Sequence, residues 1–439
     1  MRRHHEYVVG VDVGSSSTRA IAINRSGEVL ATSATRYGTQ NEDAGEADPE
    51  VWLAATIDSV ARIDADGSPK AICVGGHGPT TVALSGELAI TFRHPAGHGG
   101  TAFEQAAGQA AALRKKLGRG TKPRQLWDWL LSRMGGSSST QGTWPDTPIL
   151  DGFGDSIPVG TSVGVTRGIS GIPDGIHLVP GANDAYMTTW GSGVDTPGKA
   201  FDPGGKTGGL GVAVVTGPGA EFSRYGMPSA VPGVYIVGGP VAAHGAMLDW
   251  WAGITRRSIP ELLELAAEAA PGAGGVMVLP FLEGERAPRW NPGLSAEILG
   301  LHAAADVGVV ARAILEGTAY GLGHLQRSLE DRGIRMDRLI SSGGPSRSRL
   351  WTQIKADVLE VPIDVPSCSQ MASYGSALGA GAGVGWWPIP GAGKSGDWPH
   401  PDMTTIQPQP RDVYRYGLSR FIELGDEAEG RLGGDRSAQ

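Results

Sequence analysis

The sequence has few cysteines, few aromatic residues and no long apolar run, and each shortage excludes a class of protein. Only two cysteines, Cys73 and Cys368, occur in 439 residues, and aromatic residues make up 6%. A disulfide framework or a zinc site needs more thiols or a ligand spacing that is absent here. No apolar stretch is long enough to span a membrane, and the basic start MRRHHEYVVGVDVG breaks at Asp12, which is not typical of a signal peptide. We therefore expect a reduced, cytoplasmic protein without a membrane partner.

An excess of positive charge is also missing. The formal net charge is −8, with 37 Lys and Arg against 45 Asp and Glu, so no nucleic-acid partner is predicted. What the chain has in excess is glycine, with 69 residues. Glycine serves tight turns and close approaches of the backbone to a ligand. The length predicts two or three domains.

The stretch PGKAFDPGGKTGG at 197–209 contains Gly205-Lys206-Thr207 and resembles a phosphate-binding P-loop. A P-loop needs a glycine five positions earlier and a helix afterwards, but Ala200 stands there and the strand-like GGLGVAVV follows. The segment therefore predicts a hairpin turn and not a P-loop.

Both halves of the chain read as a β-meander near a glycine-rich turn, followed by alternating helices and strands. We expect helices over 49–63 (capped by Asp48), 103–118, 123–135, 242–254, 260–270, 306–333, 349–362 and 373–386. A strand is expected over 275–288, and the turn-rich 135–156 is expected to be a surface loop. This is a weak internal duplication of architecture without a sequence repeat.

Three glycine-rich turns are candidates for phosphate and nucleotide binding. GVDVGSSSTR puts Asp12 at a strand end before amide and hydroxyl donors, which can cradle phosphate beside a hydrated Mg²⁺. GGKTGG at 204–209 and SGGP at 342–345 are similar turns. The alternatives are an ordinary hairpin with an Asx-type turn, a flexible surface turn with a solvated lysine, and a plain strand-to-helix turn.

Asp184, in GANDAY, is flanked by small residues that leave room for a substrate. Phosphoryl transfer needs one group to accept the proton of the attacking hydroxyl, and an aspartate suffices. The alternative is that Asp184 is the N-cap of the helix AYMTTW, and the two roles are compatible.

Seven segments, in order, resemble the FGGY carbohydrate kinases, whose members include xylulokinase, ribulokinase and gluconokinase. They are GVDVGSSSTRAIAIN, EADPEVW, VPGANDAYMTTWGSGV, FLEGERAPRW, ARAILEGTAYGL, SSGGPSRSRLWTQIKADVLEVPI and ASYGSALGAGAGVG. The resemblance implies an α/β fold of two ribonuclease-H-like domains, as in actin and Hsp70, with a central cleft. It implies an N-terminal domain over 1–193 on the sugar side, shortened around 95–175, and a nucleotide-side domain over 194–425. Residues 426–439 are predicted to be a disordered tail.

The resemblance also implies roles for individual residues. Asp184 is the expected general base, and Asp184 and Asp12, the latter through water, are the expected metal ligands for Mg²⁺. Substrate is expected to contact His77, Arg93, Asn183 and Asp184. ATP and its phosphates are expected to contact Gly14, Ser15, Ser16, Thr18, Arg19, Gly205, Lys206, Thr207, Gly343, Gly344 and Pro345.

Three departures from the family pattern affect these expectations. Lys206 replaces a small hydroxyl residue, and it either holds the β- or γ-phosphate or points to water. GGHGPTT replaces the usual substrate turn, so His77 stands for either its glutamine or its histidine. TFRHPAGHGG offers Arg93, His94 and His98 as polar candidates, or as ordinary structural and solvent-facing residues.

The sequence thus predicts an ATP- and Mg²⁺-dependent kinase that phosphorylates a hydroxyl of a small sugar, ketose or polyol. Two other classes stay open: a nucleotide-binding pseudokinase or regulator, and an actin- or Hsp70-like ATPase that transfers nothing to a sugar. The resemblance leaves a homodimer open.

Overall fold

The computed structural model describes residues 6–38, 45–97, 101–215 and 226–436, which form two compact units. Unit 1 comprises Met1–Asp195, Thr216–Tyr235 and Gln370–Pro401, and unit 2 comprises Thr196–Val215, Ile236–Ser369 and Asp402–Gln439. The predicted division at 193 and 194 lies close to the first crossing of the chain. The structure differs from that prediction because the chain returns to unit 1 twice.

Unit 1 is built on a six-stranded sheet with the strand order β11-β12-β5-β1-β2-β3. β1 pairs antiparallel with β2 and parallel with β5, and β5 pairs parallel with β12. A smaller sheet has the order β4-β7-β6-β8, and β9 pairs with β10. The elements are β1 (Glu6–Val13), β2 (Ser17–Ile23), β3 (Val29–Arg36), β4 (Glu46–Ala47), α1 (Pro49–Ala61), β5 (Ser68–Gly76), β6 (Thr81–Ala83), β7 (Ala89–Ile90), α2 (Ala102–Leu117), β8 (Pro123–Gln125), α3 (Leu126–Arg133), β9 (Thr140–Thr143), β10 (Asp155–Pro158), β11 (Gly164–Val165), β12 (His177–Asn183), α4 (Asp184–Gly191), β15 (Met227–Pro228) and α9 (Met371–Gly383).

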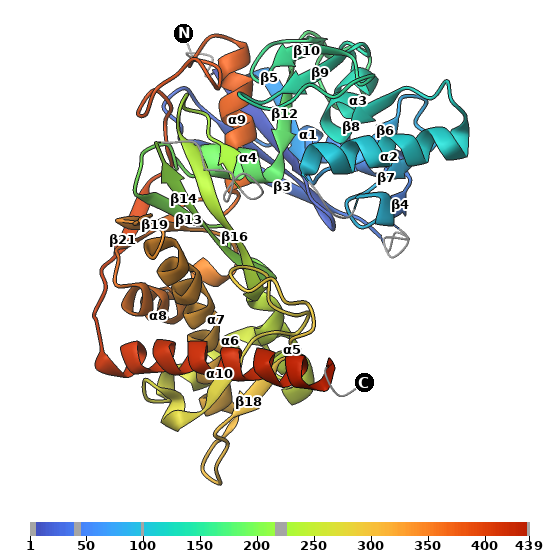
Figure 1. The fold of residues 1–439 in the computed structure, drawn as a ribbon. Helices are drawn as coiled ribbons and strands as arrows, with labels where there is room; N and C mark the ends of the chain where they lie inside the picture. Colours follow the sequence, from blue (N-terminus) through green and yellow to red (C-terminus); the bar gives the residue numbers. More distant parts are fainter. Residues whose placement is uncertain (1–5, 39–44, 98–100, 216–225, 437–439) are drawn as a thin grey trace. The chain divides into compact units, whose positions relative to one another are not determined.

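Unit 2 repeats this arrangement in the strand order β16-β14-β13-β19-β20-β21 (Figure 1). β13 pairs antiparallel with β14 and parallel with β19, as β1 does with β2 and β5. The elements are β13 (Lys199–Asp202), β14 (Thr207–Val214), β16 (Tyr235–Ala243), α5 (Gly245–Thr255), α6 (Ile259–Glu268), β17 (Met277–Leu279), β18 (Glu297–Leu299), α7 (Val307–Glu330), β19 (Arg338–Ser341), α8 (Arg349–Leu359), β20 (Ile363–Pro366), β21 (Met403–Ile406) and α10 (Asp412–Arg436). The predicted duplication of architecture is therefore present in the two main sheets.

Helix ends follow the local sequence signals. Asp48 caps α1 by accepting from the Glu50 amide at 2.9 Å, as predicted. α2 begins with a capping box in which Thr101 and Glu104 exchange hydrogen bonds. α3 begins later than predicted, because 123–125 pair with β6 as a strand.

Two predictions about elements within the units were wrong. Only the part of 275–288 before Pro280 is a strand, because proline has no amide to continue the ladder. The expected loop over 135–156 contains β9 and the start of β10, joined in parallel. Gln141 fixes this segment by donating to the carbonyl oxygens of Leu150 and Gly154 at 2.9 and 2.8 Å.

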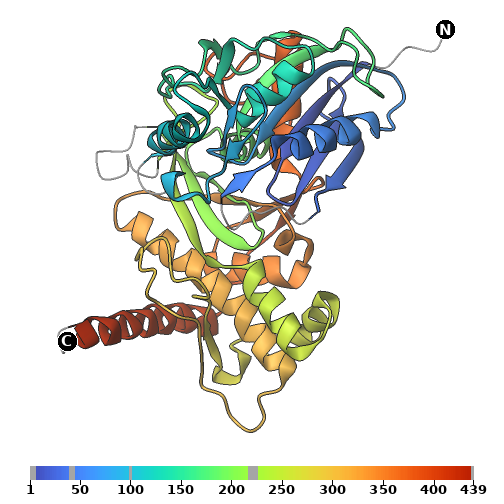
Figure 2. The same ribbon diagram turned by 90° about the vertical axis from the view of Figure 1, so that its right-hand side faces the viewer.

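The predicted disordered tail is helical as far as residue 436. α10 runs as one long helix, drawn in red in Figure 2. Arg289 donates to the Ile422 carbonyl oxygen at 2.9 Å and to Asp426 at 2.8 Å, and Asn291 donates to Glu429 at 2.9 Å. These bonds hold the second half of α10 against unit 2, and residues 437–439 lie outside the described residues.

α9 shows how a late segment completes unit 1. It packs on β1, β5 and α4, and small residues let the backbones approach closely. A Cβ atom at Gly10 would lie 2.0 Å from the Ser373 carbonyl oxygen, and one at Gly375 would lie 2.0 Å from that of Met187. The small residues of this helix therefore serve packing.

None of the helices in the described part of the chain is long and apolar enough to cross a membrane. Cys73 and Cys368 are both buried, and neither is part of a disulfide.

Candidate active site

The first candidate hairpin joins β1 to β2 in unit 1. Gly14 donates its amide to the Ser17 carbonyl oxygen at 3.1 Å, so the turn itself is Gly14–Ser17, with Ser15 half-buried and Ser16 exposed. Thr18 is fully buried, and its hydroxyl shares a hydrogen bond of 2.8 Å with Tyr37. Arg19 is exposed in β2, opposite Asp12. The turn itself thus contains Gly14, Ser15 and Ser16, three of the five phosphate-binding residues predicted in this segment. The Thr18 side chain points away from the turn, into the unit.

Asp12 lies near the end of β1 and is 9% exposed. Among the described residues its Oδ1 atom has no hydrogen-bond partner. Burial raises the pKa of Asp12 to about 6, and the positive charge of Arg19 opposes this rise. An unpaired buried carboxylate oxygen is costly unless a ligand or cation completes it.

Asp184 is the first residue of α4, directly after β12. The N-cap is its neighbour Asn183, whose side chain accepts from the Ala185 amide at 2.8 Å, so the prediction that Asp184 caps the helix was wrong. Burial raises the pKa of Asp184 to about 7, the nearby negative charge of Asp12 raises it further, and the Ala185 amide lowers it. Two carboxylates from the ends of β1 and β12 therefore lie near one another in unit 1.

The donor set suits Mg²⁺. Mg²⁺ prefers carboxylate oxygens, keeps several waters and is commonly bound by one or two carboxylates together with substrate phosphates. Within the described residues no group of three or more His, Cys, Asp or Glu could hold a metal ion, so the protein offers no closed cage. Asp12 and Asp184, one with an orphaned oxygen, fit an ion held partly by its ligands.

His77 is a buried residue, 5% exposed, set between the rings of Trp52 and Phe92. Its Nδ1 lies 2.7 Å from the Val13 carbonyl oxygen, and burial lowers the pKa of the ring to about 4. The imidazole is therefore neutral and is anchored beside β1. Arg93 is exposed, with its guanidinium 5.5 Å from the Phe92 ring centre. His98 lies outside the described residues.

A pocket of about 580 Å³ in unit 2 contains four of the predicted nucleotide residues: Gly205, Lys206, Gly344 and Pro345. Its apolar walls come from Leu248, Ile259, Pro260, Leu263 and Trp351, and its polar groups from Asp249, Arg347 and Ser348. An apolar slot with a few polar groups at its edge is typical of a small-molecule site. Thr207 and Gly343 stand next to the pocket in the chain but do not line it.

The two glycine turns of this pocket require glycine. Gly204 and Gly343 have φ angles of 53° and 76°. A Cβ at Gly204 would lie 2.1 Å from the Ser342 carbonyl oxygen, and one at Gly343 would lie 2.7 Å from that of Pro203. The ends of β13 and β19 can therefore approach only without side chains at these positions.

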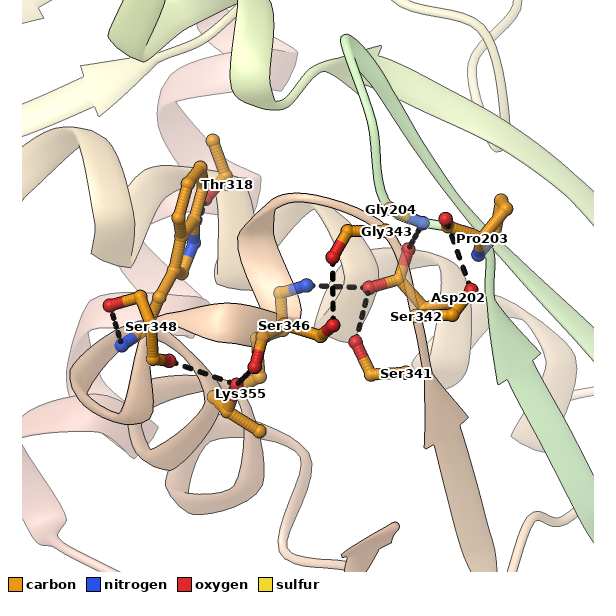
Figure 3. A network of polar contacts seen from close by, with 12 residues as sticks. Asp202, Pro203, Gly204, Thr318, Ser341, Ser342, Gly343, Ser346, Ser348 and Lys355 are labelled. Carbon is orange, nitrogen blue, oxygen red and sulfur yellow. Dashed lines mark hydrogen bonds and ion pairs between the residues drawn. The ribbon is translucent and has the colours of Figure 1, made fainter. Parts of the chain in front are cut away.

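A buried ion pair lies next to these two turns and fixes their position (Figure 3). Asp202 and Lys355 are both fully buried, and the Asp202 Oδ2 atom lies 2.5 Å from the Lys355 ammonium. Asp202 also accepts from the Ser341 hydroxyl at 3.1 Å and from the Gly204 amide at 3.0 Å. Burial alone would raise the pKa of Asp202, but Lys355 and the hydrogen bonds hold it below its ordinary value.

Sequence reasoning missed His244, which is fully buried behind the second hairpin. Its amide donates to the Lys206 carbonyl oxygen at 2.8 Å, and its ring stacks on Trp351 with centres 5.4 Å apart. Burial and Lys355 lower the pKa of the ring to about 3, so it is neutral. A Cβ at Gly208 would lie 1.9 Å from its Nδ1, which explains one more glycine of the run. A histidine before the start of a helix gave no signal of this role.

The sequence comparisons agree with this geometry. Residues 212–384 match the C-terminal domain of the FGGY family of carbohydrate kinases. The chain is 21% identical to the xylulose kinase of Staphylococcus xylosus over 87% of its own length and 92% of that protein's. The resemblance to the FGGY family is confirmed.

Other FGGY-type relatives match in part or in fold. A glycerol kinase of Gloeobacter violaceus is 34% identical over 35% of this chain and 31% of that protein. The crystal structure of ligand-bound xylulose kinase from Lactobacillus acidophilus superposes with a TM-score of 0.79 at 18% identity, covering 98% and 99% of the two chains. The predicted fold class of two ribonuclease-H-like domains is confirmed, and the family match agrees with the predicted class of enzyme, a carbohydrate kinase.

Proposed function

We propose that this protein transfers the γ-phosphate of ATP to a hydroxyl of a small sugar, ketose or polyol, with Asp184 as the general base. The observation that carries the proposal is the pair of buried carboxylates, Asp12 and Asp184, in which the pKa of Asp184 is raised to about 7. A base is most effective when its pKa lies near the working pH. An ordinary surface aspartate would be a much weaker base.

The chemistry requires little from the protein beyond positioning and charge. The oxygen of the acceptor hydroxyl forms a bond to the γ-phosphorus, and the bond from that phosphorus to the bridging oxygen of ATP breaks. ADP leaves with the electron pair, and the proton of the hydroxyl passes to the Asp184 carboxylate. Asn183 supports this role because its cap bond fixes the start of α4, where Asp184 stands.

Asp12 and Asp184 would hold Mg²⁺, which supplies neutralisation of the phosphate charge when bound. The unpaired Oδ1 of Asp12 supports this assignment. The turn Gly14–Ser17 offers backbone amides and the hydroxyls of Ser15 and Ser16 to phosphate oxygens.

Unit 2 would bind the nucleotide in the pocket between the Gly204–Thr207 turn and Pro345. Its apolar wall suits a base, and Lys206 at its edge suits a phosphate. Lys206 is the most marked departure from the family pattern at this site, and we assign it to the phosphates of ATP.

A pair of variants tests the proposal. Asp184→Asn should lower kcat by about 10²–10⁴-fold, because general-base catalysis contributes that much, and should leave the affinity for ATP measured without Mg²⁺ unchanged. Lys206→Ala should weaken ATP binding by about 10- to 150-fold, because a hydrogen bond to a charged group contributes about 1.5–3 kcal/mol, and should leave acceptor KM unchanged. Lys199→Ala, at the far end of β13, is the matched control for the loss of a positive charge.

The measurements are acceptor-dependent ADP release over a panel of pentuloses, hexuloses, aldonates, polyols and cyclitols, and calorimetric titration with ATP. Near-normal turnover by Asp184→Asn would remove Asp184 from the mechanism. ATP hydrolysis that no acceptor accelerates would instead indicate an ATPase, and ATP binding without any turnover would indicate a regulator.

A further inference from the structure

Unit 1 contains a recess whose wall includes the residues that precede Asp184 in the chain. We call this recess the uncharged pocket. It is formed by α2, β8, α3, β9, the loop after β9, and the junction of β12 with α4. Ala182 and Asn183, the residues directly before Asp184, are part of its wall. Among the described residues that line it, none is Lys, Arg, Asp, Glu or His. Most of its wall comes from the region 95–175, the part of the sugar-side domain that the sequence predicts to be shortened.

Two buried donors in this pocket have no partner. Gln125 and Trp127 are 5% and 6% exposed, and within the described part of the chain Gln125 Nε2 and Trp127 Nε1 make no hydrogen bond. Buried N–H groups are nearly always paired, and a ligand with oxygen atoms in this pocket would give both donors a partner. Gln141 also lines the pocket. Its side-chain amide donates to the carbonyl oxygens of Leu150 and Gly154, so it holds the wall in place.

An aromatic wall accompanies these donors. Trp144 and Tyr186 lie with ring centres 5.1 Å apart, and Phe103 also lines the pocket. Trp144 Nε1 donates to the Pro228 carbonyl oxygen at 2.9 Å, which fixes the indole. Burial raises the pKa of Tyr186 to about 12, so its hydroxyl stays protonated. The surface is preformed, largely apolar and without charge.

On the basis of the proposed function, we propose that the uncharged pocket holds the acceptor, and that this acceptor is a neutral polyol, ketose or cyclitol. Its oxygens accept from Gln125 Nε2 and Trp127 Nε1, and its C–H face packs on Trp144. An aldonate or a sugar phosphate would have to bury its negative charge in this pocket without a positively charged partner, which is unfavourable. The pocket therefore selects by charge among acceptors of the same size.

Acceptors matched in carbon number test this selection. D-Glucitol and D-gluconate share a six-carbon chain and differ at one end in charge, and xylitol and D-xylonate form a second pair. ADP release should have a kcat/KM at least about 100-fold higher for the better neutral member than for its aldonate, since an unpaired buried charge costs several kcal/mol.

Two variants test the donors. Trp127→Phe and Gln125→Leu should each raise the KM of the best neutral acceptor by about 3- to 10-fold, the value of one hydrogen bond, with ATP KM unchanged. Trp129→Phe is the matched control: it lies in the same helix, its indole N–H is also buried and unpaired among the described residues, and it does not line the pocket. The control should behave as the unaltered protein.

Calorimetric titration of the same neutral acceptor without ATP separates this inference from the proposed function. Binding that weakens in Trp127→Phe and not in Trp129→Phe supports the pocket even if no phosphate is transferred, which would refute only the kinase reaction. Equal use of aldonates, or identical behaviour of Trp127→Phe and Trp129→Phe, overturns the inference while the kinase reaction stands. No binding of any neutral acceptor overturns it as well.

Discussion

At the residue scale, Asp184 combines a position that is evident from the sequence with a raised pKa that only the folded structure produces. Its position after a buried strand and among small residues was evident from the sequence. Its raised pKa was not, because that property comes from burial and from Asp12, which stands on β1. The cap that the sequence allowed for Asp184 belongs to Asn183, one position earlier, and this leaves the Asp184 carboxylate available for chemistry.

The raised pKa of Asp184 makes stability depend on pH. Between about pH 4 and pH 7 the folded state holds a proton that the unfolded state has released, so the free energy of unfolding falls as the pH rises through this range. Asp184→Asn removes the titration. The free energy of unfolding of the variant minus that of the unaltered protein should therefore be larger at pH 8 than at pH 5 by roughly 2 kcal/mol, as measured by urea unfolding.

The exposed Asp151, also in unit 1, provides the control variant Asp151→Asn. A constant difference between Asp184→Asn and the unaltered protein across this range would mean that Asp184 titrates like an ordinary aspartate. The acid side of the kcat/KM profile should fall near pH 7 in the unaltered enzyme, because the base must be unprotonated.

At the element scale, the ion pair of Asp202 and Lys355 joins β13 to α8. In the sequence, Lys355 reads as one residue of an amphipathic helix, and a lysine there is expected in solvent. Its partner lies 153 positions away, and nothing local announces the pairing. The role of this pair in holding the Gly204 turn could be found only from the packed structure.

Breaking the pair should be costly. Lys355→Met leaves a buried carboxylate without its countercharge and should lower the free energy of unfolding by about 3–5 kcal/mol. The double variant Asp202→Asn with Lys355→Met should recover most of this loss, since the buried charge is gone. Arg415→Met, which removes an exposed pair with Glu360, should leave the free energy of unfolding almost unchanged. A single variant as stable as Arg415→Met would show that Asp202 is not held as an ion there.

At the scale of the whole molecule, the chain completes unit 1 only after it has built most of unit 2. The sequence predicted two successive domains, because contiguous segments are the simplest interpretation of a linear pattern. The helix of small residues at 373–386 was recognised as a helix, but its partners on β1 and α4 were not. The same limit applies to α10, whose second half is ordered by Arg289 and Asn291.

A fragment of residues 1–195 should therefore not fold cooperatively, because the faces of β1 and β5 that α9 covers would be exposed. Urea unfolding followed by circular dichroism should show no sharp transition. Gly375→Ala in the full chain should also destabilise unit 1, since its Cβ would lie 2.0 Å from the Met187 carbonyl oxygen. Gly38→Ala, with nothing within 4 Å, is the control. A cooperative transition in the fragment would contradict the prediction.

The sequence by itself determined the resemblance to the FGGY kinases, the strand-turn-strand units, most helices, and the positions of Asp12, Asp184 and the glycine turns, because these depend on local spacing and local turn chemistry. The tertiary structure alone decided the burial that shifts the two carboxylates, the pairing of Asp202 with Lys355, and the unpaired donors of Gln125 and Trp127. Those properties depend on which side chains from distant segments exclude water together, and no local pattern in the chain encodes that.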